Sequence, residues 1–481
     1  MIKLFLSTLI GLVILVGACV IYFWRDTAYD PSAIDLGLYF LALPLMITTV
    51  VFAPVFIIKA MKAQKEKKQL QAEQEALRYE QQQIDALERE RPKELPSEQF
   101  ELHIYSAHSW HSFGENTEII DSIKAFKSPE LDQKLMNSYG LPILSYRIQD
   151  LDDLIDSTLD EDDLPVMSMR EKRIHSLIRQ QFEQHAETLA MVSNHLKQSA
   201  LFYDSELAYQ YKMHPGWTQE NFVDDHEEDK TPVQEVPRLN RFTVHILLAE
   251  NLIHQWNEQS KFELQEALSI QYAILPEQIQ IEHHFFSSQT AYSEWTKLLK
   301  DAANTANEVN FLISVDSEID QECLDERFWL NEQYIASEFV SSWCVANTST
   351  VLLDLQPLTT LWLSVNENNF SNYLKNNQLN ELEQFQQEHP FVLVLDDAND
   401  VKTTKTLQRV FEDTAIDFHH FLYTKQNLGH TQNLSKVFGF MLGMHLPEEM
   451  INMIYSTEQD STYAFFKAYE FDQSETVMTQ N

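Results

Sequence analysis

A lysine and a histidine stand close together near the C-terminus, in the block Lys425-Gln-Asn-Leu-Gly-His430. Gly429 directly precedes the histidine, which is typical of a tight turn, and apolar residues then recur at helical spacing over 434–441. An ammonium group and an imidazole at such a turn could hold a polar ligand. They could equally hydrogen-bond within the turn itself, and the sequence leaves both interpretations open.

Two histidine pairs, His283-His284 and His419-His420, could supply metal ligands together with acidic residues such as Asp396 and Asp397. Adjacent residues on a strand point to opposite faces of the sheet, so each pair offers at most one ligand. We therefore expect no metal site. The chain has nine glycines and no phosphate-cradling loop motif, so we also expect no cofactor.

The block at 425–430 resembles the K-x-N-x-G-H signature of the β-ketoacyl synthases, which belong to the thiolase-like superfamily. In that family the lysine and the histidine face an acyl thioester. Three further segments follow the family's order. They are a Ser-Ser-Gln-Thr-Ala stretch at 287–291 before a helix, a strand with a Val-Asp pair at 311–317, and the strand and loop at 391–400.

The resemblance implies a damaged active site. A condensing enzyme needs a thiolate nucleophile at a strand-to-helix turn and two histidines that stabilise developing negative charge. An ungapped match places Phe285, within a residue or two, at the nucleophile position. Asp397 falls in the motif of the first histidine, so only Lys425 and His430 remain. Because catalytic groups act as a unit, we expect a pseudoenzyme, with active thioester chemistry as the alternative.

From Arg241 onward, strands alternate with helices, which predicts a layered α/β fold. The resemblance narrows this to a thiolase-like fold with paired five-stranded layers. The predicted strands after residue 240 are 242–248, 278–286, 309–315, 339–345, 350–355 and 391–395. The predicted helices there are 291–304 and 401–411.

The N-terminal region contains two apolar runs, at 4–24 and 36–58, each long enough to cross a bilayer. Lysines follow the second run and are absent from the loop between the runs. This pattern predicts a transmembrane hairpin over 1–60 with both ends in the cytoplasm. Val16-Gly17-Ala18-Cys19 also resembles a bacterial lipobox, so lipidation of Cys19 is the competing interpretation.

Residues 61–92 predict a charged, coiled-coil-like helical linker that ends at a proline. The N-terminal part of the soluble region then covers 93–236, the thiolase-like part 237–470, and a tail 471–481. Two acidic runs, at 150–163 and 224–229, lack the pattern of a calcium-binding loop, so we expect solvated loops.

The formal net charge is −38, from 73 acidic and 35 basic residues, and such a chain repels phosphate backbones. We therefore expect no nucleic acid partner. Cys19, Cys323 and Cys344 are the three cysteines. Because Cys19 lies in the first apolar run, at most one disulfide could form in the soluble part, which fits a reducing compartment. Neither Cys323 nor Cys344 falls at the nucleophile position.

Together these observations predict a non-catalytic scaffold or adaptor that residues 1–60 anchor in a bacterial inner membrane. Its soluble domain would be cytoplasmic, and its layout is like that of accessory subunits of envelope or secretion machines. We expect protein partners, with a homodimer as one of them. The alternative is an enzyme or binder of acyl-carrier or coenzyme A thioesters.

Overall fold

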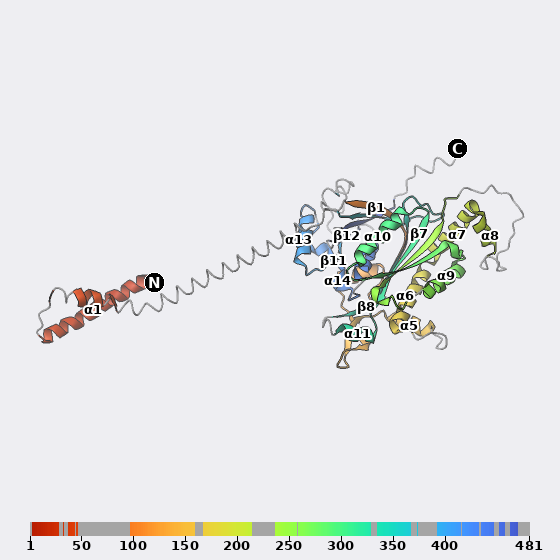
Figure 1. The fold of residues 1–481 in the computed structure, drawn as a ribbon. Helices are drawn as coiled ribbons and strands as arrows, with labels where there is room; N and C mark the ends of the chain where they lie inside the picture. Colours follow the sequence, from red (N-terminus) through yellow and green to blue (C-terminus); the bar gives the residue numbers. More distant parts are fainter. Residues whose placement is uncertain are drawn as a thin grey trace. The chain divides into compact units, whose positions relative to one another are not determined.

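The computed structural model of the 481-residue chain divides into two compact units, Met1–Glu94 and Leu95–Asn481 (Figure 1). The structure describes residues 2–27, 32, 37–43, 45–46, 97–158, 167–213, 236–256, 258–328, 334–366, 373, 392–414, 416–431, 434–446, 452–456 and 462–469. The predicted linker at 61–92, the acidic run at 224–229, the tail at 471–481 and most of the second apolar run lie outside these residues.

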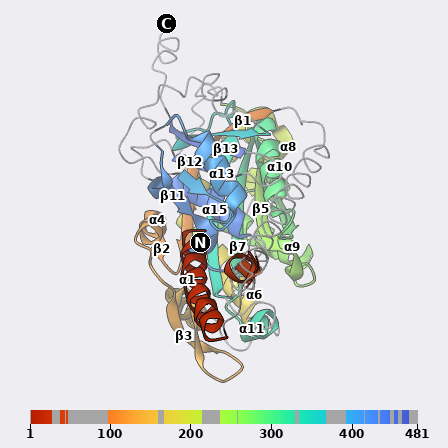
Figure 2. The ribbon, with the colours of Figure 1, turned by 90° about the vertical axis from the view of Figure 1, so that its left-hand side faces the viewer.

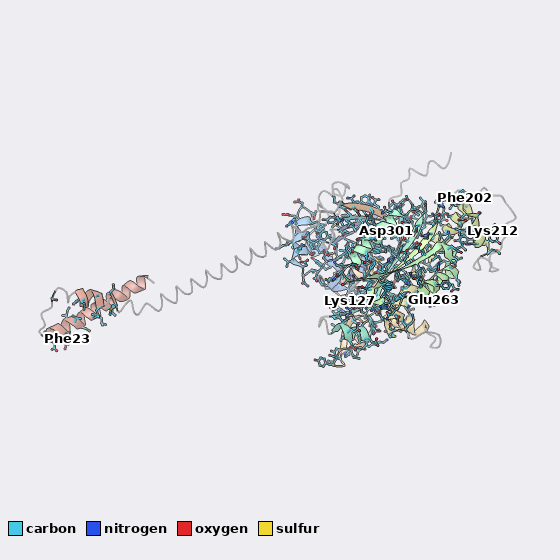
Figure 3. All side chains as sticks on the ribbon, viewed as in Figure 1. Phe23, Lys127, Phe202, Lys212, Glu263 and Asp301 are labelled. Carbon is cyan, nitrogen blue, oxygen red and sulfur yellow. The ribbon has the colours of Figure 1, made fainter. Side chains whose placement is uncertain are left out.

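The smaller unit contains the helix α1 (Ile2–Thr27) and the short π-helix η1 (Leu38–Ala42). The first apolar run lies within α1. Apolar side chains of this helix are exposed, among them Leu15 and Phe23 (Figure 3). Across the described ranges, no helix meets the combined demands of length and apolar character for crossing a bilayer.

The larger unit is built on one mixed sheet of 13 strands, ten of which follow the order β11-β10-β12-β13-β9-β1-β8-β7-β5-β6. Five of these strands come from the earlier part of the sequence: β1 (Glu98–His111), β5 (Arg241–Ala249), β6 (Ile279–Phe286), β7 (Glu308–Ser317) and β8 (Ala336–Asn347). The other five come from the later part of the sequence: β9 (Thr359–Val365), β10 (Val392–Val394), β11 (Phe421–Tyr423), β12 (Asn452–Ser456) and β13 (Thr462–Ala468).

These ten strands form two halves with the same internal arrangement. In β6-β5-β7-β8-β1 the first three strands are parallel, and β8 is antiparallel to both neighbours. In β11-β10-β12-β13-β9 the same pattern recurs, with β13 antiparallel to both neighbours. An antiparallel β1–β9 pair joins the halves, which lie side by side in Figure 2. The two five-stranded groups that the resemblance implies are therefore present, as halves of one continuous sheet.

Helices occupy both faces of each half. Between the halves, α10 (Ala291–Asn304) and α15 (Ser435–Met441) share one apolar core with strands of both. On its other face, the first half packs against α6 (Met169–Gln184), α7 (Ala186–Tyr203) and α9 (Glu258–Tyr272). The second half packs there against α13 (Val401–Val410). Because helices cover both faces, β5 is buried at every position after Arg241, as a continuous apolar run requires.

The remaining described helices surround this framework. They are α4 (Thr117–Lys124), α5 (Gln149–Thr158), α8 (Ser205–Met213), α11 (Gln321–Phe328) and α14 (Thr424–Asn427). One of them is α8, on which Figure 3 labels Lys212, close to Phe202 of α7 in the sequence. A short hairpin of β3 (Glu130–Met136) and β4 (Pro142–Tyr146) extends the sheet, and β2 (Gly114–Glu115) pairs with β1.

Two local predictions were wrong. Residues 350–355 form no strand, because Asp354 has a φ of +56° and Leu352 bridges back to Leu355. The strand lies later, at β9. The acidic run at 150–163 is also not a solvated loop over its first part, since 149–158 form α5 and Asp152 binds basic side chains. Its last residues lie outside the described ranges.

Burial lowers the pKa of three buried histidines of the larger unit to about 3. They are His111, His185 and His445. Each is neutral in the folded chain above about pH 3, whereas the unfolded chain takes up a proton below about pH 6.5. The free energy of unfolding should therefore fall as the pH falls below 6.5, by about 1.4 kcal/mol per pH unit for each histidine. Glu318, whose pKa burial raises to about 7, opposes this with one carboxyl group.

Urea unfolding between pH 7 and pH 5 measures this slope. The variant His445→Asn should have a slope shallower by about one proton, since it removes one imidazole that is neutral in the folded chain and protonated in the unfolded chain. The matched variant His419→Asn removes an exposed imidazole and should leave the slope unchanged. Equal slopes for wild type and His445→Asn would contradict the burial of a neutral imidazole at 445.

Candidate functional site

The predicted block lies at the carboxyl end of β11. Lys425 is on α14, which follows β11 directly, and His430 follows the turn after that helix. The neighbouring parallel strand β10 ends at Val394, so the loop containing Asp397 emerges at the same edge of the sheet. Ligand sites of open parallel sheets form at this edge, where successive loops meet. The structure therefore brings together the two segments that the resemblance paired.

Two carboxylates of the loop after β10, Asp396 and Asp397, contact side chains of other elements. The Nζ atom of Lys425 is 3.6 Å from Oδ2 of Asp397, and Gln426 donates a hydrogen bond of 2.7 Å to Oδ1. This pair is half-exposed, so it adds little to stability. Asp396 is 3% exposed, lies 3.6 Å from Nζ of Lys436, and accepts a 2.9 Å hydrogen bond from Ser456.

His430 is tied to the start of β8. Its backbone amide donates to the carbonyl of Ile335 at 2.9 Å, and its Nδ1 accepts from the amide of Ile335 at 3.4 Å. The rings of His430 and Tyr334 are 5.6 Å apart. Burial lowers the pKa of His430, which keeps the imidazole neutral at pH 7. The imidazole therefore makes a structural contact in the turn.

Gly429 makes the turn, as the sequence predicted. Its φ is +76°, a left-handed conformation that favours glycine. A Cβ atom at this position would lie 2.5 Å from the ring of Tyr146 and 2.7 Å from Cβ of Ser337. The other two glycines of this region leave no room for a side chain, because Gly439 packs against Thr424 and Gly443 packs against Ile454.

The predicted nucleophile position lies at the end of β6. Phe286 is 1% exposed and belongs to the core between the two halves of the sheet. Phe285 packs on the opposite face. Tyr292 follows on α10, and Nζ of Lys436 lies 6.0 Å from the centre of its ring. The aromatic segment therefore approaches the Lys436–Asp396 pair, with no thiol or hydroxyl nucleophile at either phenylalanine.

The two cysteines of the larger unit are protonated at neutral pH. Cys344 is fully buried within β8, and burial raises the pKa of its thiol to about 12. Cys323, on α11, is half-buried, and burial raises its pKa to about 11 despite the nearby Arg170. A thiolate is the nucleophilic form of cysteine, so neither residue is prepared for acyl transfer.

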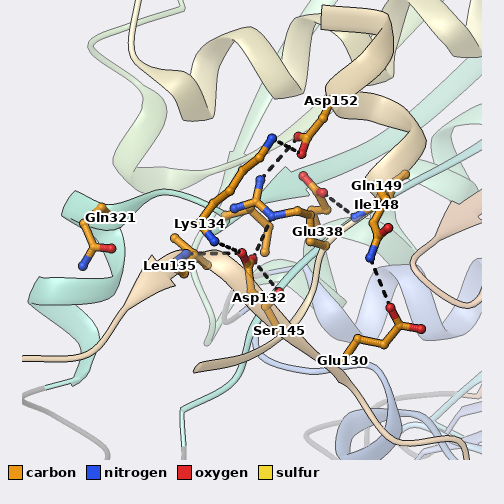
Figure 4. Close-up of polar contacts among 12 residues, drawn as sticks. Glu130, Asp132, Lys134, Leu135, Ser145, Ile148, Gln149, Asp152, Gln321 and Glu338 are labelled. Carbon is orange, nitrogen blue, oxygen red and sulfur yellow. Dashed lines mark hydrogen bonds and ion pairs between the residues drawn. The ribbon is translucent and has the colours of Figure 1, made fainter. Parts of the chain in front are cut away.

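A buried network of arginines and carboxylates is the feature that sequence analysis missed, and Figure 4 shows the part of it around Asp132, Lys134 and Asp152. Arg173 of α6 donates two hydrogen bonds of 2.6 Å to Glu338 of β8, and both side chains are 0% exposed. Glu338 also accepts from the amide of Ile148 at 2.7 Å and from Ser317 at 2.9 Å. Paired, hydrogen-bonded charges are the condition under which such groups can be buried.

The network extends in both directions. Arg170, one turn earlier on α6, donates to Asp316 at 2.8 Å. Asp152 binds Arg173 and also Lys134, the latter at 2.7 Å (Figure 4). Arg147 connects Asp152 to Asp132, whose carboxylate it contacts at 2.7 Å. These ion pairs hold α5, α6 and the β3–β4 hairpin to the ends of β7 and β8.

Helical spacing on α6 carried a signal for this network. Arg170, Arg173, Ile174 and Leu177 lie at the spacing of one helix face, and all four are buried. Next to the network, residues 110–114, 127–130, 145 and 147–150 line a cavity of about 200 Å³. This is smaller than the usual volume of a small-molecule site.

Comparisons with known proteins give a likeness of fold. No protein-family model matches the chain, and no curated protein matches it. The similar solved structures include two of the ketosynthase from module 6 of the bacillaene synthase of Bacillus subtilis 168. The wild-type domain is 8% identical, with a TM-score of 0.40 over 77% of this chain and 72% of that one. A mutant form is 10% identical, with a TM-score of 0.39 over 78% of this chain and 73% of that one.

These solved structures are ketosynthase domains, the class of protein that the block at 425–430 resembles. The larger unit is a mixed α/β domain. Superposition at these TM-scores is loose, so the ketosynthase structures assign no role to any residue of this chain. The roles of Lys425, Asp397 and His430 depend on their own contacts.

Proposed function

We propose that the protein is a ketosynthase-like pseudoenzyme that serves as a scaffold or adaptor at a bacterial inner membrane. The observation that carries the proposal is the contact between Asp397 and Lys425 at 3.6 Å. A ketosynthase places donors at this edge to stabilise negative charge that develops on a thioester oxygen. A carboxylate at the same edge would repel that charge and occupies the lysine instead.

Two further features support the loss of catalysis. The predicted nucleophile position has phenylalanines, of which Phe286 fills the core between the sheet halves. His430, the remaining histidine of the pattern, makes backbone contacts with Ile335. A condensing enzyme needs its groups together, so a lone neutral imidazole should not support turnover.

The membrane anchor of this proposal rests on the two apolar runs at 4–24 and 36–58 and on the lysines that follow them. Exposed apolar side chains on α1 support it, since water disfavours such a surface. Within the smaller unit, Gly17 of α1 lies close to Phe40 of η1, with 3.0 Å between a built Cβ and the ring. A close approach at glycine is typical of helix pairs in bilayers. The larger unit would then face the cytoplasm and dock protein partners, with a second copy as one candidate.

Crosslinking of the full chain in intact bacterial membranes tests both parts of the proposal. The chain should stay with the membranes after an alkaline carbonate wash and should crosslink to a defined protein partner. Cys19→Ala should remain in the membrane to the same extent, because apolar spans rather than a lipid would hold it. Release of the wild type by carbonate, or release of Cys19→Ala alone, would contradict the hairpin. Recovery of an uncrosslinked monomer would contradict the adaptor role.

A further inference from the structure

Two histidines and a glutamate meet on neighbouring strands at the edge of the sheet. His245 of β5 and Glu282 of β6 are register partners in the parallel pair. His284 is two residues beyond Glu282 and therefore lies on the same face of β6. His283 lies on the other face, where its ring contacts Trp256 at 5.4 Å between centres. The strand geometry thus selects one histidine of the pair at 283–284, as the sequence predicted.

Three potential ligand atoms of these residues form a small triangle. Nδ1 of His245 is 3.0 Å from Nε2 of His284 and 3.3 Å from Oε2 of Glu282. Nε2 of His284 is 3.5 Å from the same oxygen. A Zn²⁺ ion with bonds of about 2.0–2.1 Å holds tetrahedral ligands about 3.3 Å apart. The three separations bracket this value.

Neighbouring side chains orient the ligands. Nε2 of His245 lies 3.0 Å from Oδ1 of Asn310 on β7, and an amide oxygen can only accept a hydrogen bond. Nε2 therefore carries the proton, and the lone pair of Nδ1 points into the triangle. Gln280 donates a 2.5 Å hydrogen bond to the other oxygen of Glu282. Hydrogen bonds of this kind from neighbouring side chains fix the tautomer and direction of metal ligands.

Charge and exposure also suit a cation. Glu282 supplies a carboxylate and His284 an imidazole nitrogen, and Zn²⁺ binds both ligand types in proteins. His245 is 8% exposed, whereas Glu282 is 38% and His284 25% exposed, so solvent reaches the triangle from one side.

We propose that His245, Glu282 and His284 bind one divalent transition-metal ion, with Zn²⁺ as the probe that their geometry and donor types fit best. Three protein ligands leave a fourth position open to water. The ion would also fasten the edge strand β6 to β5. This site is independent of the proposed scaffold function, because none of its ligands belongs to the segments at 395–400 or 424–436. The expectation of no metal site considered the histidine pairs with Asp396, Asp397 and His430, and left out His245 and Glu282.

Isothermal titration of the metal-depleted full chain with Zn²⁺ tests the proposal. The wild type should bind one ion per chain with a clear saturation point. Glu282→Gln and His284→Gln should each weaken binding by more than tenfold, because each removes a direct ligand. His283→Gln is the matched control, since it removes the adjacent imidazole on the opposite face, and it should bind as the wild type does.

Co²⁺ provides a second measurement that needs no substitution. The wild-type chain with Co²⁺ should show the intense visible absorption of a four-coordinate site, and added Zn²⁺ should abolish it. This result decides the question if the substituted chains fail to fold. No binding of either ion would overturn the proposal and leave a proton shared among the three side chains. Equal affinity of wild type and His284→Gln, or weaker binding in His283→Gln alone, would also overturn it.

Discussion

Replacing Arg173 with methionine should lower the free energy of unfolding by about 3–5 kcal/mol. Arg173 and Glu338 are both 0% exposed and share two hydrogen bonds of 2.6 Å. Methionine fills most of the space but leaves the carboxylate of Glu338 buried without its cation. The remaining donors, the amide of Ile148 and the hydroxyl of Ser317, carry no charge. Chemical denaturation of the full chain measures the loss through the transition of the larger unit.

Arg179→Met is the matched control for this substitution. Arg179 lies on the same helix, is 70% exposed, and approaches Glu183 at 3.5 Å. An exposed pair of this kind is worth less than about 1 kcal/mol. The double variant Arg173→Met with Glu338→Leu should recover much of the loss, because it removes the uncompensated charge. A loss in Arg173→Met no larger than that in Arg179→Met would contradict the buried network.

Substitution of Gly429 by alanine should destabilise the larger unit by about 2–5 kcal/mol, from two additive causes. Its φ of +76° costs about 1–2 kcal/mol for a residue with a Cβ atom. That Cβ would also lie 2.5 Å from the ring of Tyr146 and 2.7 Å from Cβ of Ser337, so the turn before His430 must shift. Overpacking of this kind costs about 1–3 kcal/mol.

Gly140→Ala separates these two causes. Gly140 has nearly the same backbone conformation, with a φ of +71°, but a Cβ there would meet no atom within 4 Å. The alanine variant at 140 should therefore show the conformational cost alone, about 1–2 kcal/mol. Equal losses at the two positions would mean that Tyr146 and Ser337 do not enclose Gly429.

The sequence predicted the features that depend on local spacing. The turn at Gly429, the helix at 291–304 and the buried strands around 242–248 and 309–315 follow from glycine position and from apolar periodicity, and the structure contains all of them. The doubled five-stranded arrangement came from family resemblance and not from periodicity. Strand order is a long-range property that no local window contains.

The buried charges illustrate what local patterns leave out. Arg173 looks like any arginine of a charged helix until its partner is known, and Glu338 is 165 residues away in the chain. Local patterns also miss the cluster of His245, Glu282 and His284, because His245 lies on β5 and its register partner Glu282 lies on β6. Asp397 could be aligned to a histidine position from sequence alone. Its contacts with Lys425 and Gln426 required the two loops to be placed at one edge of the sheet.

The proposed function requires that the chain has no working acyl-transfer centre. Intact-protein mass spectrometry of the full chain after exposure to acetyl and malonyl thioesters tests it most directly, with an active ketosynthase as the positive control. We expect no change in mass at neutral pH, because the chain has phenylalanine at 285 and 286 and protonated thiols at Cys323 and Cys344. A stoichiometric acyl adduct that is lost in His430→Ala would show that the acyl-transfer centre still reacts, and it would contradict the proposed loss of catalysis.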